Sequence, residues 1–408
     1  MTGLDDQAFD FYAHHWDPRA PGEAALRESA IREMPVRYPV TKSDSHGGFW
    51  LVSGYHAASE VLHDWETFSN NPVRAFFGRP AERPPMPPID LDRPVQSEYR
   101  RLLDPVLTPK RIAGYEPGIR ALVTELLDGF IEDGQCDFAG QFALQFPGRM
   151  LYSFLFGIDD SDVMRVKTWT EQSLDDPFGP VGKAAQVNWN NWLHDLIRER
   201  RTAERRDDII DALLYGQVEG RLLTEREIVG CLQVIILGGL GTTADVLDNT
   251  MIRLSADREL QQYLRENPGR LDIDEFLRLD TPVPVSTRLC TRPTTLDGVE
   301  LAPGDRVALF TAAAHRDPKE FPDPDALKLG RVPNRHLGFG AGPHRCLGSH
   351  VARLNFRIAM EEILSRVTDF WITPGDAPRR QEPQALTFSI NYLPLSFTPG
   401  PRRGTGQG

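Results

Sequence analysis

The sequence predicts a mainly helical protein with a minor β region, an α+β fold. Helical spacing of apolar residues dominates from Ser97 to about Leu213. A second observation is an apolar run from Thr224 to about Ser255, which predicts one long helix. Short strand-like stretches are confined to the N-terminal third and to the region after residue 295.

The N-terminal third reads as a strand followed by a helix. Residues 49–52 form an apolar run, and a helical pattern extends from Gly54 to about His63. A proline-rich passage from Asn71 to Pro94 then predicts a long loop, because proline suits neither a helix interior nor a central strand. Loops of this length inside a compact domain are usually functional.

The long helix is capped and locally weakened. Thr224 and Glu227 form a capping box at its start, and its middle is apolar on all sides, which predicts a buried central helix. Residues 238–243 read GGLGTT. Three glycines in four residues weaken a helix, either to leave space for a ligand or a bulge, or to let another helix pack closely. Before this helix, residues 175–182 interrupt the helical pattern.

The last third changes period. Residues 295–301 predict a hairpin with an Asp-Gly turn, residues 306–310 a further strand, and residues 391–397 the last strands. Between them, Cys346 stands between a glycine-rich turn and an apolar-striped helix. A thiolate at a helix N-terminus is stabilised by unpaired N–H groups, and the glycines leave room for a flat ligand.

Composition excludes several classes. The 408 residues carry a net charge of −12, which opposes binding to nucleic acid. Four cysteines without a CxxC pair favour a reducing compartment. The start lacks a basic region followed by an apolar run, and the longest apolar stretch, residues 228–240, is too short to span a bilayer. We therefore expect a cytoplasmic protein that does not bind membranes.

The segment around the cysteine resembles that of the cytochrome P450 family. The family pattern Phe-Gly-x-Gly-x-His-x-Cys-x-Gly is filled at every fixed position. The resemblance implies the P450 fold, with haem b lying between the long central helix and the cysteine-loop helix, and with Cys346 as the axial thiolate ligand of the iron. The loop positions that it assigns to cofactor binding are Phe339, Gly340, Gly342, His344, Cys346 and Gly348. The alternative for a lone cysteine is an inert buried thiol.

Matching positions extend from about residue 35 to residue 397, which implies a single haem domain over residues 1–408. Residues 1–34 are then an N-terminal extension, and residues 399–408 are expected to be a flexible tail.

The resemblance also assigns a catalytic segment. Thr242 stands where the family places a hydroxyl that donates a hydrogen bond to bound oxygen, and Thr243 and Gly241 flank it. Gly241 is a departure, because the family usually has an acid there that helps to deliver protons. We hypothesise that waters beside Gly241, or a polar group of the substrate, supply them. Asp245 is one turn further on, from which only an indirect path leads to this point.

Two further sets of residues match family motifs. Glu275, Arg278 and Arg331 correspond to a buried structural network, although a Glu-x-x-Arg pair is by itself usually a solvated surface pair. Haem carries two propionates, and buried carboxylates need charge-assisted partners. The matching positions are Gln96, Arg100, Arg288 and His344, for each of which a solvated surface group is the simpler alternative.

Substrate contacts are implied by position only. The regions that line the pocket in the family offer an apolar set with aromatic walls, which suits a small-to-medium hydrophobic ligand: Phe76, Phe77, Phe178, Leu237, Gly238, Val285 and Phe388. Arg74 and Arg79 lie near the first two in sequence, where they either bind a carboxylate or, more commonly, face solvent.

The leading hypothesis is a monooxygenase that inserts one atom of O2 into a C–H or C=C bond. No flavin or iron–sulfur domain fits within the chain, so electrons are expected from a separate ferredoxin and ferredoxin reductase, with a monomeric enzyme. Lys110, Arg111, Arg345 and Arg353 are candidate docking residues for an acidic partner, or simply solvated charges. The rival hypotheses are a peroxide-driven or otherwise atypical haem-thiolate enzyme, suggested by Gly241, and a haem sensor or carrier without turnover.

Overall fold

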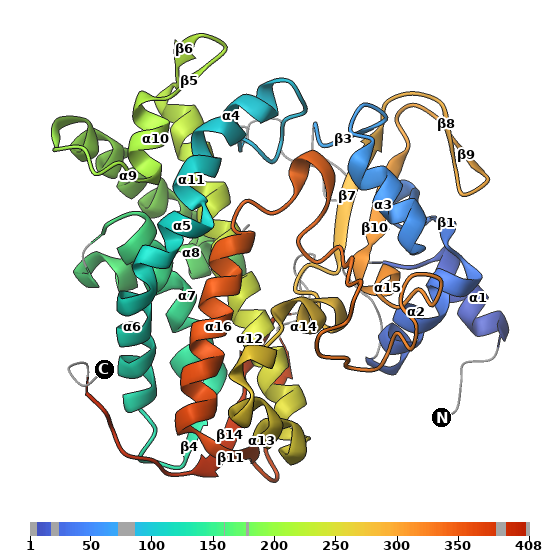
Figure 1. The fold of residues 1–408 in the computed structure, drawn as a ribbon. Coiled ribbons are helices and arrows are strands. Elements are labelled where there is room, and N and C mark those ends of the chain that lie inside the picture. The colour runs from blue at the N-terminus through green and yellow to red at the C-terminus, as the bar shows by residue number, and fades with distance from the viewer. Residues whose placement is uncertain are drawn as a thin grey trace.

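The computed structural model describes residues 6–17, 24–71, 86–158, 160–176, 179–380 and 389–404. The chain is mainly helical with several small sheets, as the sequence predicts. A strand-rich part and a helical part lie side by side, with helix α16 in front in the view of Figure 1. The predicted site residues Phe76, Phe77, Phe178 and Phe388, and also Arg74 and Arg79, lie outside the described residues.

The strand-rich part is built on a five-stranded sheet of order β1-β2-β10-β7-β3. Its strands are β1 (Val40–Ser43), β2 (Phe49–Val52), β3 (Phe68–Ser69), β7 (Val285–Cys290) and β10 (Arg306–Phe310). Strands β2 and β10 pair in parallel, with Ala308 opposite Leu51, and the other pairs are antiparallel. The helices of this part are α1 (Asp6–His14), α2 (Ala24–Arg37), α3 (Tyr55–His63) and α15 (Thr311–Ala314). The predicted strand 49–52 and helix 54–63 are thus confirmed.

The N-terminal helices belong to the core of this part. Phe9 and Trp16 are buried, and the Trp16 ring lies 4.9 Å from that of Phe310 on β10. Residues 1–34 are therefore more than an appended extension, because the described part of them buries aromatic side chains against the sheet.

The helical part contains most of the chain. Its helices are α4 (Val95–Leu103), α5 (Pro109–Ile112), α6 (Glu116–Asp128), α7 (Gln145–Met150), α8 (Asp160–Asp175), α9 (Pro180–Thr202), α10 (Ile209–Tyr215), α11 (Glu225–Gly239), α12 (Gly241–Ser255), α13 (Arg258–Glu266), α14 (Ile273–Leu279) and α16 (Ser349–Arg366). Two π-helical segments, η4 (Ala139–Ala143) and η5 (Leu151–Leu155), flank α7. The predicted interruption near residues 175–182 separates α8 from α9.

The predicted long helix is two helices. The capping box of Thr224 and Glu227 begins α11, as expected. The helix then breaks at Leu240, whose backbone ψ of −75° leaves the helical range, and α12 starts at Gly241. The glycine-rich sequence accounts for this break, because each glycine in a helix costs up to about 1 kcal/mol of stability relative to alanine.

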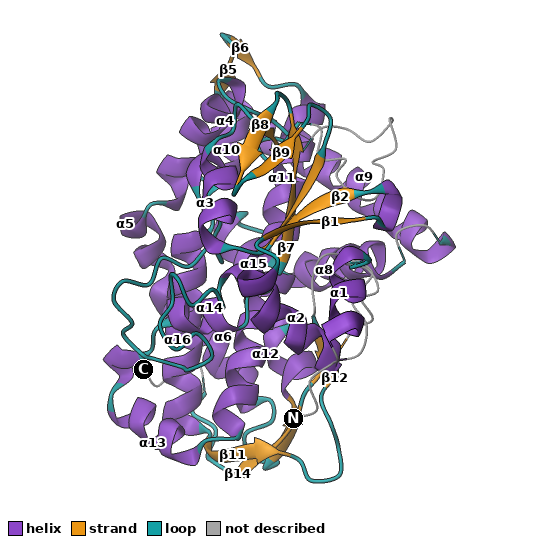
Figure 2. Cartoon of the chain, turned by 90° about the vertical axis from the view of Figure 1, so that its right-hand side faces the viewer, coloured by secondary structure: helices purple, strands orange, loops and turns teal. Residues whose placement is uncertain are grey.

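Smaller sheets complete the fold. They are the three-stranded sheet of β11 (Thr368–Ile372), β14 (Pro394–Thr398) and β4 (Gln135–Asp137), and the hairpins β5 (Gln217–Val218) with β6 (Arg221–Leu222), β8 (Thr294–Leu296) with β9 (Val299–Leu301), and β12 (Arg379–Arg380) with β13 (Ile390–Tyr392). Asp297 and Gly298 turn the β8–β9 hairpin with positive φ, as an Asp-Gly turn requires. Helices separate the five-stranded sheet from the β11–β14 pair (Figure 2).

Residues 399–404, part of the expected flexible tail, make hydrogen bonds to the rest of the chain through their backbone N–H groups. The N–H of Gly400 donates to the carbonyl of Ile131 at 3.0 Å, and those of Arg403 and Gly404 donate to Asp128 at 3.2 and 2.8 Å. These hydrogen bonds hold the tail against the protein, and its Gly- and Arg-rich sequence does not predict them.

Candidate functional site

The cysteine loop is held in a tight conformation by its own backbone. The N–H of Cys346 donates to the carbonyl of Phe339 at 2.7 Å, and that of Gly340 to Leu337 at 2.8 Å. Gly340 and Gly342 have φ of +66° and +63°. A Cβ on Gly342 would lie 2.3 Å from the carbonyl oxygen of Leu62 in α3. Only glycine fits there, so this position fixes how closely the loop approaches the strand-rich part.

Cys346 lies just before α16, with its residue exposed. The helix begins at Ser349, two residues later than the apolar pattern from Leu347 indicates, because Leu347 and Gly348 complete the turn. Burial among protein atoms raises the pKa of the thiol, while the N–H of Gly348 and the guanidinium groups of Arg100 and Arg345 oppose that rise. These donors reduce the effect of burial without cancelling it, so the pKa of the free thiol stays raised.

Three polar side chains, those of His315, His336 and Asp274, support the segment before the loop, and the sequence analysis named none of them as site residues. The Nε2 of His315 accepts the N–H of Leu337 at 2.7 Å. The Nδ1 of His336 accepts the N–H of Gly338 at 3.1 Å, so its Nε2–H donates to Asp274 at 3.0 Å. These residues come from different elements, so no spacing in the sequence links them.

Arg353 connects the same support to the ring of Phe339. Its guanidinium donates to Asp274 at 2.6 Å and lies 4.4 Å from the centre of the Phe339 ring. Phe339 is 9% exposed and its carbonyl holds the Cys346 N–H. Arg353 is therefore bound within the protein, which leaves Lys110 and Arg345 as the exposed members of the predicted docking set, with Arg111 half-buried.

Gln96 and Arg100 of α4, which the resemblance assigns to the propionates, reach the backbone of the cysteine loop. Gln96 Nε2 donates to the carbonyl of Pro343 at 2.7 Å, and Arg100 Nη1 donates to that of Arg345 at 2.8 Å. Arg100 also pairs with Asp104 at 3.3 Å. Both side chains thus position the loop through its backbone.

Arg288 and His344 lie close to each other, because the charge of Arg288 affects the pKa of His344. Arg288 on β7 is 7% exposed, and among the described residues its guanidinium donates to the carbonyl of Thr287 at 2.7 Å. Burial lowers its pKa to about 10, opposed by Asp92. Burial, then Arg288, lowers the pKa of His344 to about 4. The buried Nε2 of His344 has no hydrogen-bond partner. These groups present donors and positive charge to an anionic ligand.

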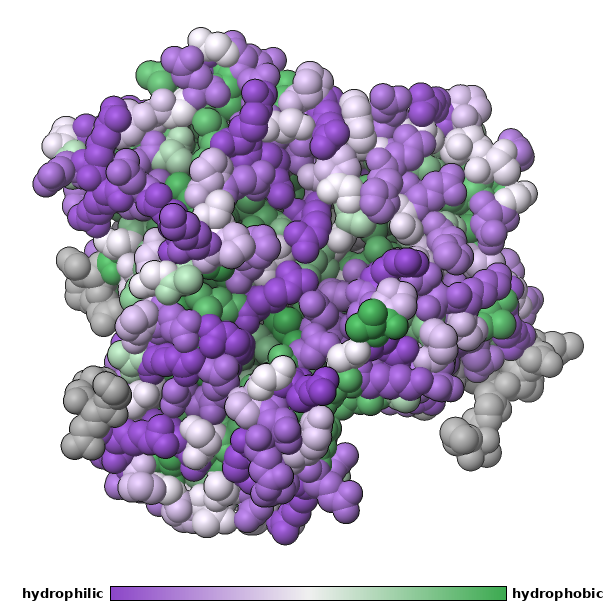
Figure 3. Space-filling model, viewed as in Figure 1, coloured by the Kyte–Doolittle hydropathy of each residue, from purple (hydrophilic) through white to green (hydrophobic). Residues whose placement is uncertain are grey.

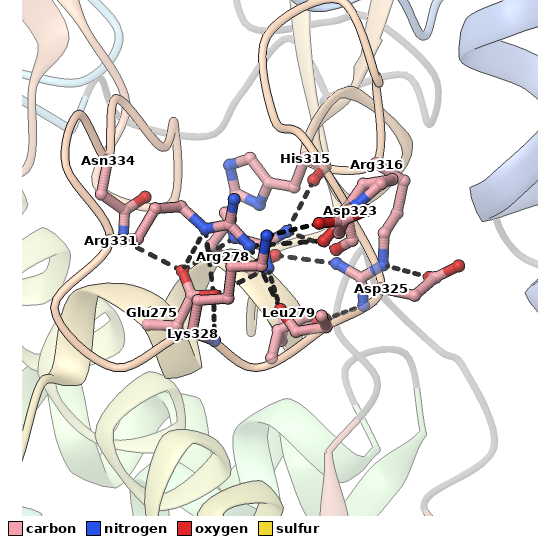
Figure 4. A network of polar contacts seen from close by, with 12 residues as sticks. Glu275, Arg278, Leu279, His315, Arg316, Asp323, Asp325, Lys328, Arg331 and Asn334 are labelled. Carbon is pink, nitrogen blue, oxygen red and sulfur yellow. Dashed lines mark hydrogen bonds and ion pairs between the residues drawn. The ribbon is translucent and has the colours of Figure 1, made fainter.

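The Glu275 network is buried, as expected (Figure 4). Glu275 and Arg278 of α14 are both fully buried, and Arg278 donates to the two carboxylate oxygens at 2.9 Å each. Arg331 Nε adds a contact at 3.1 Å, and Lys328 N and Asn334 Nδ2 add two more. Burial raises the pKa of Glu275, but these donors outweigh it and the pKa is lowered. Arg278 also binds the carbonyls of His315, Pro324 and Ala326, so the network ties α14 to the loop before the cysteine.

The α11–α12 break presents open backbone. Gly238 is exposed, and a Cβ placed on Gly238 or on Gly241 would meet no atom within 4 Å. A Cβ on Gly239 would instead lie 2.5 Å from Cδ1 of Leu151. Both interpretations of the glycines are therefore correct: Gly239 allows close packing, and the other two leave space for a ligand.

Thr242 and Thr243 follow the break. The Thr242 hydroxyl donates to the carbonyl of Gly238 at 2.7 Å, and Thr243 is buried at 8% exposure. Leu237 is partly exposed beside them. The pocket assignment of Val285 stays a prediction, and its side chain, 2% exposed, packs with Phe49 and Phe310 in the core of the strand-rich part. Strand alternation directs it to that face.

The face seen in Figure 3 is mostly hydrophilic, and apolar side chains show chiefly in its hollows. The described residues contain no group of three or more His, Cys, Asp or Glu arranged to hold a metal ion. Residues Glu225–Ser255 are long and apolar enough to cross a membrane by length and composition, but they form the central helix pair, and 44% of the apolar window is buried.

Known proteins share both the sequence and the fold. The family model described as Cytochrome P450 matches residues 272–397. The chain is 32% identical to a protein named probable cytochrome P450 127A1 of Sinorhizobium fredii, over 84% of this chain and 83% of that protein. It is 30% identical to the steroid C26-monooxygenase of Mycobacterium tuberculosis, over 93% and 96% of the two chains.

Solved structures agree. A mutant of P450 EryK in complex with erythromycin B superposes with a TM-score of 0.83 at 27% identity, covering 93% of this chain and 98% of that one. CYP108D1 of Novosphingobium aromaticivorans gives 0.83 at 27% identity, covering 94% and 97%. Since sequence, fold and a buried donor set beside a single cysteine agree, the chain belongs to the cytochrome P450 family, the monooxygenases that bind haem through a cysteine thiolate.

Proposed function

We propose that this chain is a haem-thiolate monooxygenase of a small-to-medium hydrophobic substrate, working as one domain with a separate ferredoxin-type electron donor. The observation that carries the proposal is the donor set around the cysteine loop. Arg288 and the partnerless Nε2 of His344 are buried beside a loop that presents Cys346. A flat ligand with carboxylates and a metal that takes one thiolate satisfies both features.

Each residue has a role toward haem. Cys346 would hold the iron through its thiolate, and the glycines at 340, 342 and 348 would let the loop lie close to the haem. Arg288 and His344 bind the propionates, with Arg100 close by. Gln96 holds the loop in place through Pro343. Open backbone at Gly238 and Gly241 on the opposite side leaves room for the ring and for substrate. When bound, the haem supplies the activation of O2.

The substrate contacts assigned to the described residues are Leu237 and Gly238. Both are accessible and apolar, which suits a hydrophobic ligand. Curated relatives are named a steroid C26-monooxygenase and a vitamin D(3) 25-hydroxylase. Steroids and secosteroids are therefore the first compounds to screen, with hydroxylation or epoxidation as the outcome.

Proton delivery in this chain is expected to differ from the family's usual pattern. The Thr242 hydroxyl is held by Gly238, and position 241 offers no acid. Gly241 also favours a second candidate, a peroxide-driven enzyme. Hydrogen peroxide already carries the two protons and two electrons that O2 would otherwise have to receive at this site. Lys110 and Arg345 are the exposed cations we assign to donor docking. We assign the protein to the cytoplasm as a monomer.

One spectrum tests the haem assignment. Reduced, CO-bound protein is expected to show the red-shifted absorption band of a thiolate-ligated haem, and Cys346→Ser is expected to lose that band. A wild-type spectrum without the band would remove the function. Turnover with ferredoxin, ferredoxin reductase and NADPH is then compared with turnover driven by hydrogen peroxide. Activity with peroxide alone selects the second candidate.

Gly241→Asp separates the two further. The space around position 241 accepts the side chain. If proton supply at this position limits the reaction, the variant yields more product per NADPH consumed. An unchanged yield means that protons arrive by another route.

A further inference from the structure

Two buried carboxyl groups on α12 remain unused by the proposed function. Asp245 and Asp248 are 3% and 0% exposed. Together with Gly241 they occupy positions i, i+4 and i+7 of one helix, so the three positions share a face. That face therefore begins at the position from which the usual acid is missing and continues with two acids.

The carboxylate of Asp245 is fixed by strand β13. The hydroxyl of Ser389 donates to its Oδ2 at 2.9 Å, and the backbone N–H of Ile390 donates as well. Adjacent Arg380 on β12 donates to Asn249, the next polar position of α12, at 3.2 Å. The side chain is thus held in one place, one helical turn from Gly241.

Asp248 has no such support. Among the described residues, neither of its carboxyl oxygens has a hydrogen-bond partner, although the side chain is fully buried. Burying an unpaired carboxylate there costs far more free energy than burying a neutral carboxylic acid, so Asp248 holds a proton. Burial, with Asp245 and Asp137 adding to it, raises the pKa of Asp248 well above its usual value.

The charges that act on the pair are few among the described residues. Asp248 is influenced by Asp137 at the end of β4 and by Arg380, which also acts on Asp245. Arg380 is in turn influenced by Asp280 and Arg27. Burial raises the pKa of Asp245 to about 6, opposed by Ser389, Ile390 and Arg380. A group that titrates near neutral pH gives up and regains protons readily.

We propose that Asp245 supplies protons to the reaction centre in place of the missing acid at position 241, with Asp248 as its proton reserve. The proposal rests on the proposed monooxygenase function. Side chains at i and i+4 stand about 6 Å apart, a span that one bridging water covers. A Cβ at Gly241 would meet no atom within 4 Å, so that water has room.

The proton balance is simple. An O–H bond of the Asp245 carboxyl breaks, and the proton passes toward Gly241 and Thr242. The carboxylate left behind takes the proton of Asp248, and the pair regains one proton from solvent. No other bond changes, and electrons come from the ferredoxin-type donor.

Infrared spectroscopy tests the pair without turnover. The carbonyl stretch of protonated carboxyl groups is recorded between about pH 5 and pH 8 in wild type, Asp245→Asn and Asp248→Asn. Wild type is expected to show one band that titrates with a midpoint near the pKa of about 6, absent from Asp245→Asn, and one that persists, absent from Asp248→Asn. Ser389→Ala is expected to move the midpoint upward, because the lost hydrogen bond stabilises the carboxylate. If neither Asp variant removes a band, the proposal fails.

A second measurement reads proton supply directly and needs no substrate. Haem-loaded protein with NADPH, ferredoxin, reductase and O2 consumes reducing equivalents that end as hydrogen peroxide or, with two more protons and electrons, as water. Asp245→Asn is expected to raise the peroxide fraction several-fold, and Asp245→Glu to restore it. Ser389→Ala is expected to shift the pH profile of that fraction upward, which a merely structural role does not do.

Asp376→Asn is the matched control, since this carboxylate accepts from Tyr392 of β13 but lies outside the α12 pair. It is expected to leave the peroxide fraction unchanged. If Asp245→Asn behaves like this control while the CO-bound spectrum is normal, the relay is wrong and the proposed function stands. If the wild-type spectrum lacks its band, the proposed function fails, and the infrared result still decides whether the pair holds a proton.

Discussion

Asp245 destabilises the fold at neutral pH because of where its carboxyl group lies. Its pKa rises from 3.8 to about 6 on folding, mainly through burial. The unfolded chain therefore loses this proton at lower pH than the folded protein does. Stability from this group is present below about pH 4 and falls as the pH rises to about 6, where it levels off.

Asp245→Asn is accordingly expected to be more stable than wild type at neutral pH. Two pKa units correspond to roughly 3 kcal/mol as an upper bound, because one unit is about 1.4 kcal/mol. Urea unfolding at pH 7 and at pH 4 measures the difference, which should shrink at the lower pH. Equal stability of the two proteins at both values would contradict the assigned shift.

Arg288 is the residue whose loss should weaken haem binding most selectively. Hydrogen bonds to a charged group contribute about 1.5–3 kcal/mol, so Arg288→Gln is expected to release haem roughly tenfold to a hundredfold faster. Transfer of haem to apomyoglobin measures the rate. Arg93→Gln is the control, because Arg93 is exposed on the same side of the pocket. Similar release from both variants would mean that Arg288 does not hold a propionate.

At the scale of elements, the three glycines at the α11–α12 junction have different neighbours. Gly239 faces Leu151 of η5, 3% exposed, whereas Gly238 and Gly241 face open space. A Cβ at position 239 must displace a core side chain, while one at position 241 meets nothing.

Gly239→Ala is therefore expected to lose about 1–3 kcal/mol of stability through overpacking. Gly241→Ala is expected to gain up to about 1 kcal/mol, because alanine favours the helix. The urea midpoints of the two variants should move in opposite directions. A shift of the same sign in both would show that the break, rather than the packing, decides the effect.

The same junction shows which features could be predicted from the sequence and which could not. Sequence pattern predicted the capping box of α11, the hairpin β8–β9 and the weakened helix, because each depends on neighbouring residues. Which glycine packs and which faces space could not be predicted, because Leu151 approaches from another part of the chain. The supports of the cysteine loop were missed for the same reason, since Asp274, His336 and Arg353 come together only in three dimensions.

Resemblance carried information that periodicity did not. Glu275 and Arg278 would pass for a surface pair by spacing alone, yet both are fully buried, and Glu275 pairs with Arg331 as well as with Arg278. Val285 shows what that transfer leaves open, because β7 turns this side chain toward the core. Family position gives the strand, and the direction of a side chain depends on the local register.

On the scale of the whole molecule, the C-terminal tail joins elements that are far apart in sequence. Residues 400–404 bind Ile131 and Asp128, and Arg366 of α16 binds the same Asp128. The tail therefore closes the contact between α6 and α16, the helix that follows the cysteine.

Deleting residues 399–408 is expected to lower the free energy of unfolding by about 1–3 kcal/mol, since several hydrogen bonds at a half-buried carboxylate are lost. The urea midpoint measures this loss, and Asp128→Asn should reproduce much of it. A truncated protein with the wild-type midpoint would mean that the tail contacts are dispensable.

The pairing of β2 with β10 has a consequence for folding while the chain is synthesised on the ribosome. Leu51 meets Ala308, and Gly342 sits against Leu62, so partners made early wait for segments made some 250 residues later. At about 5–20 residues per second, that wait lasts on the order of ten to fifty seconds. Cys346 is made later still, so the haem site is complete only when most of the 408 residues have been synthesised, and until then β2 lacks its partner β10.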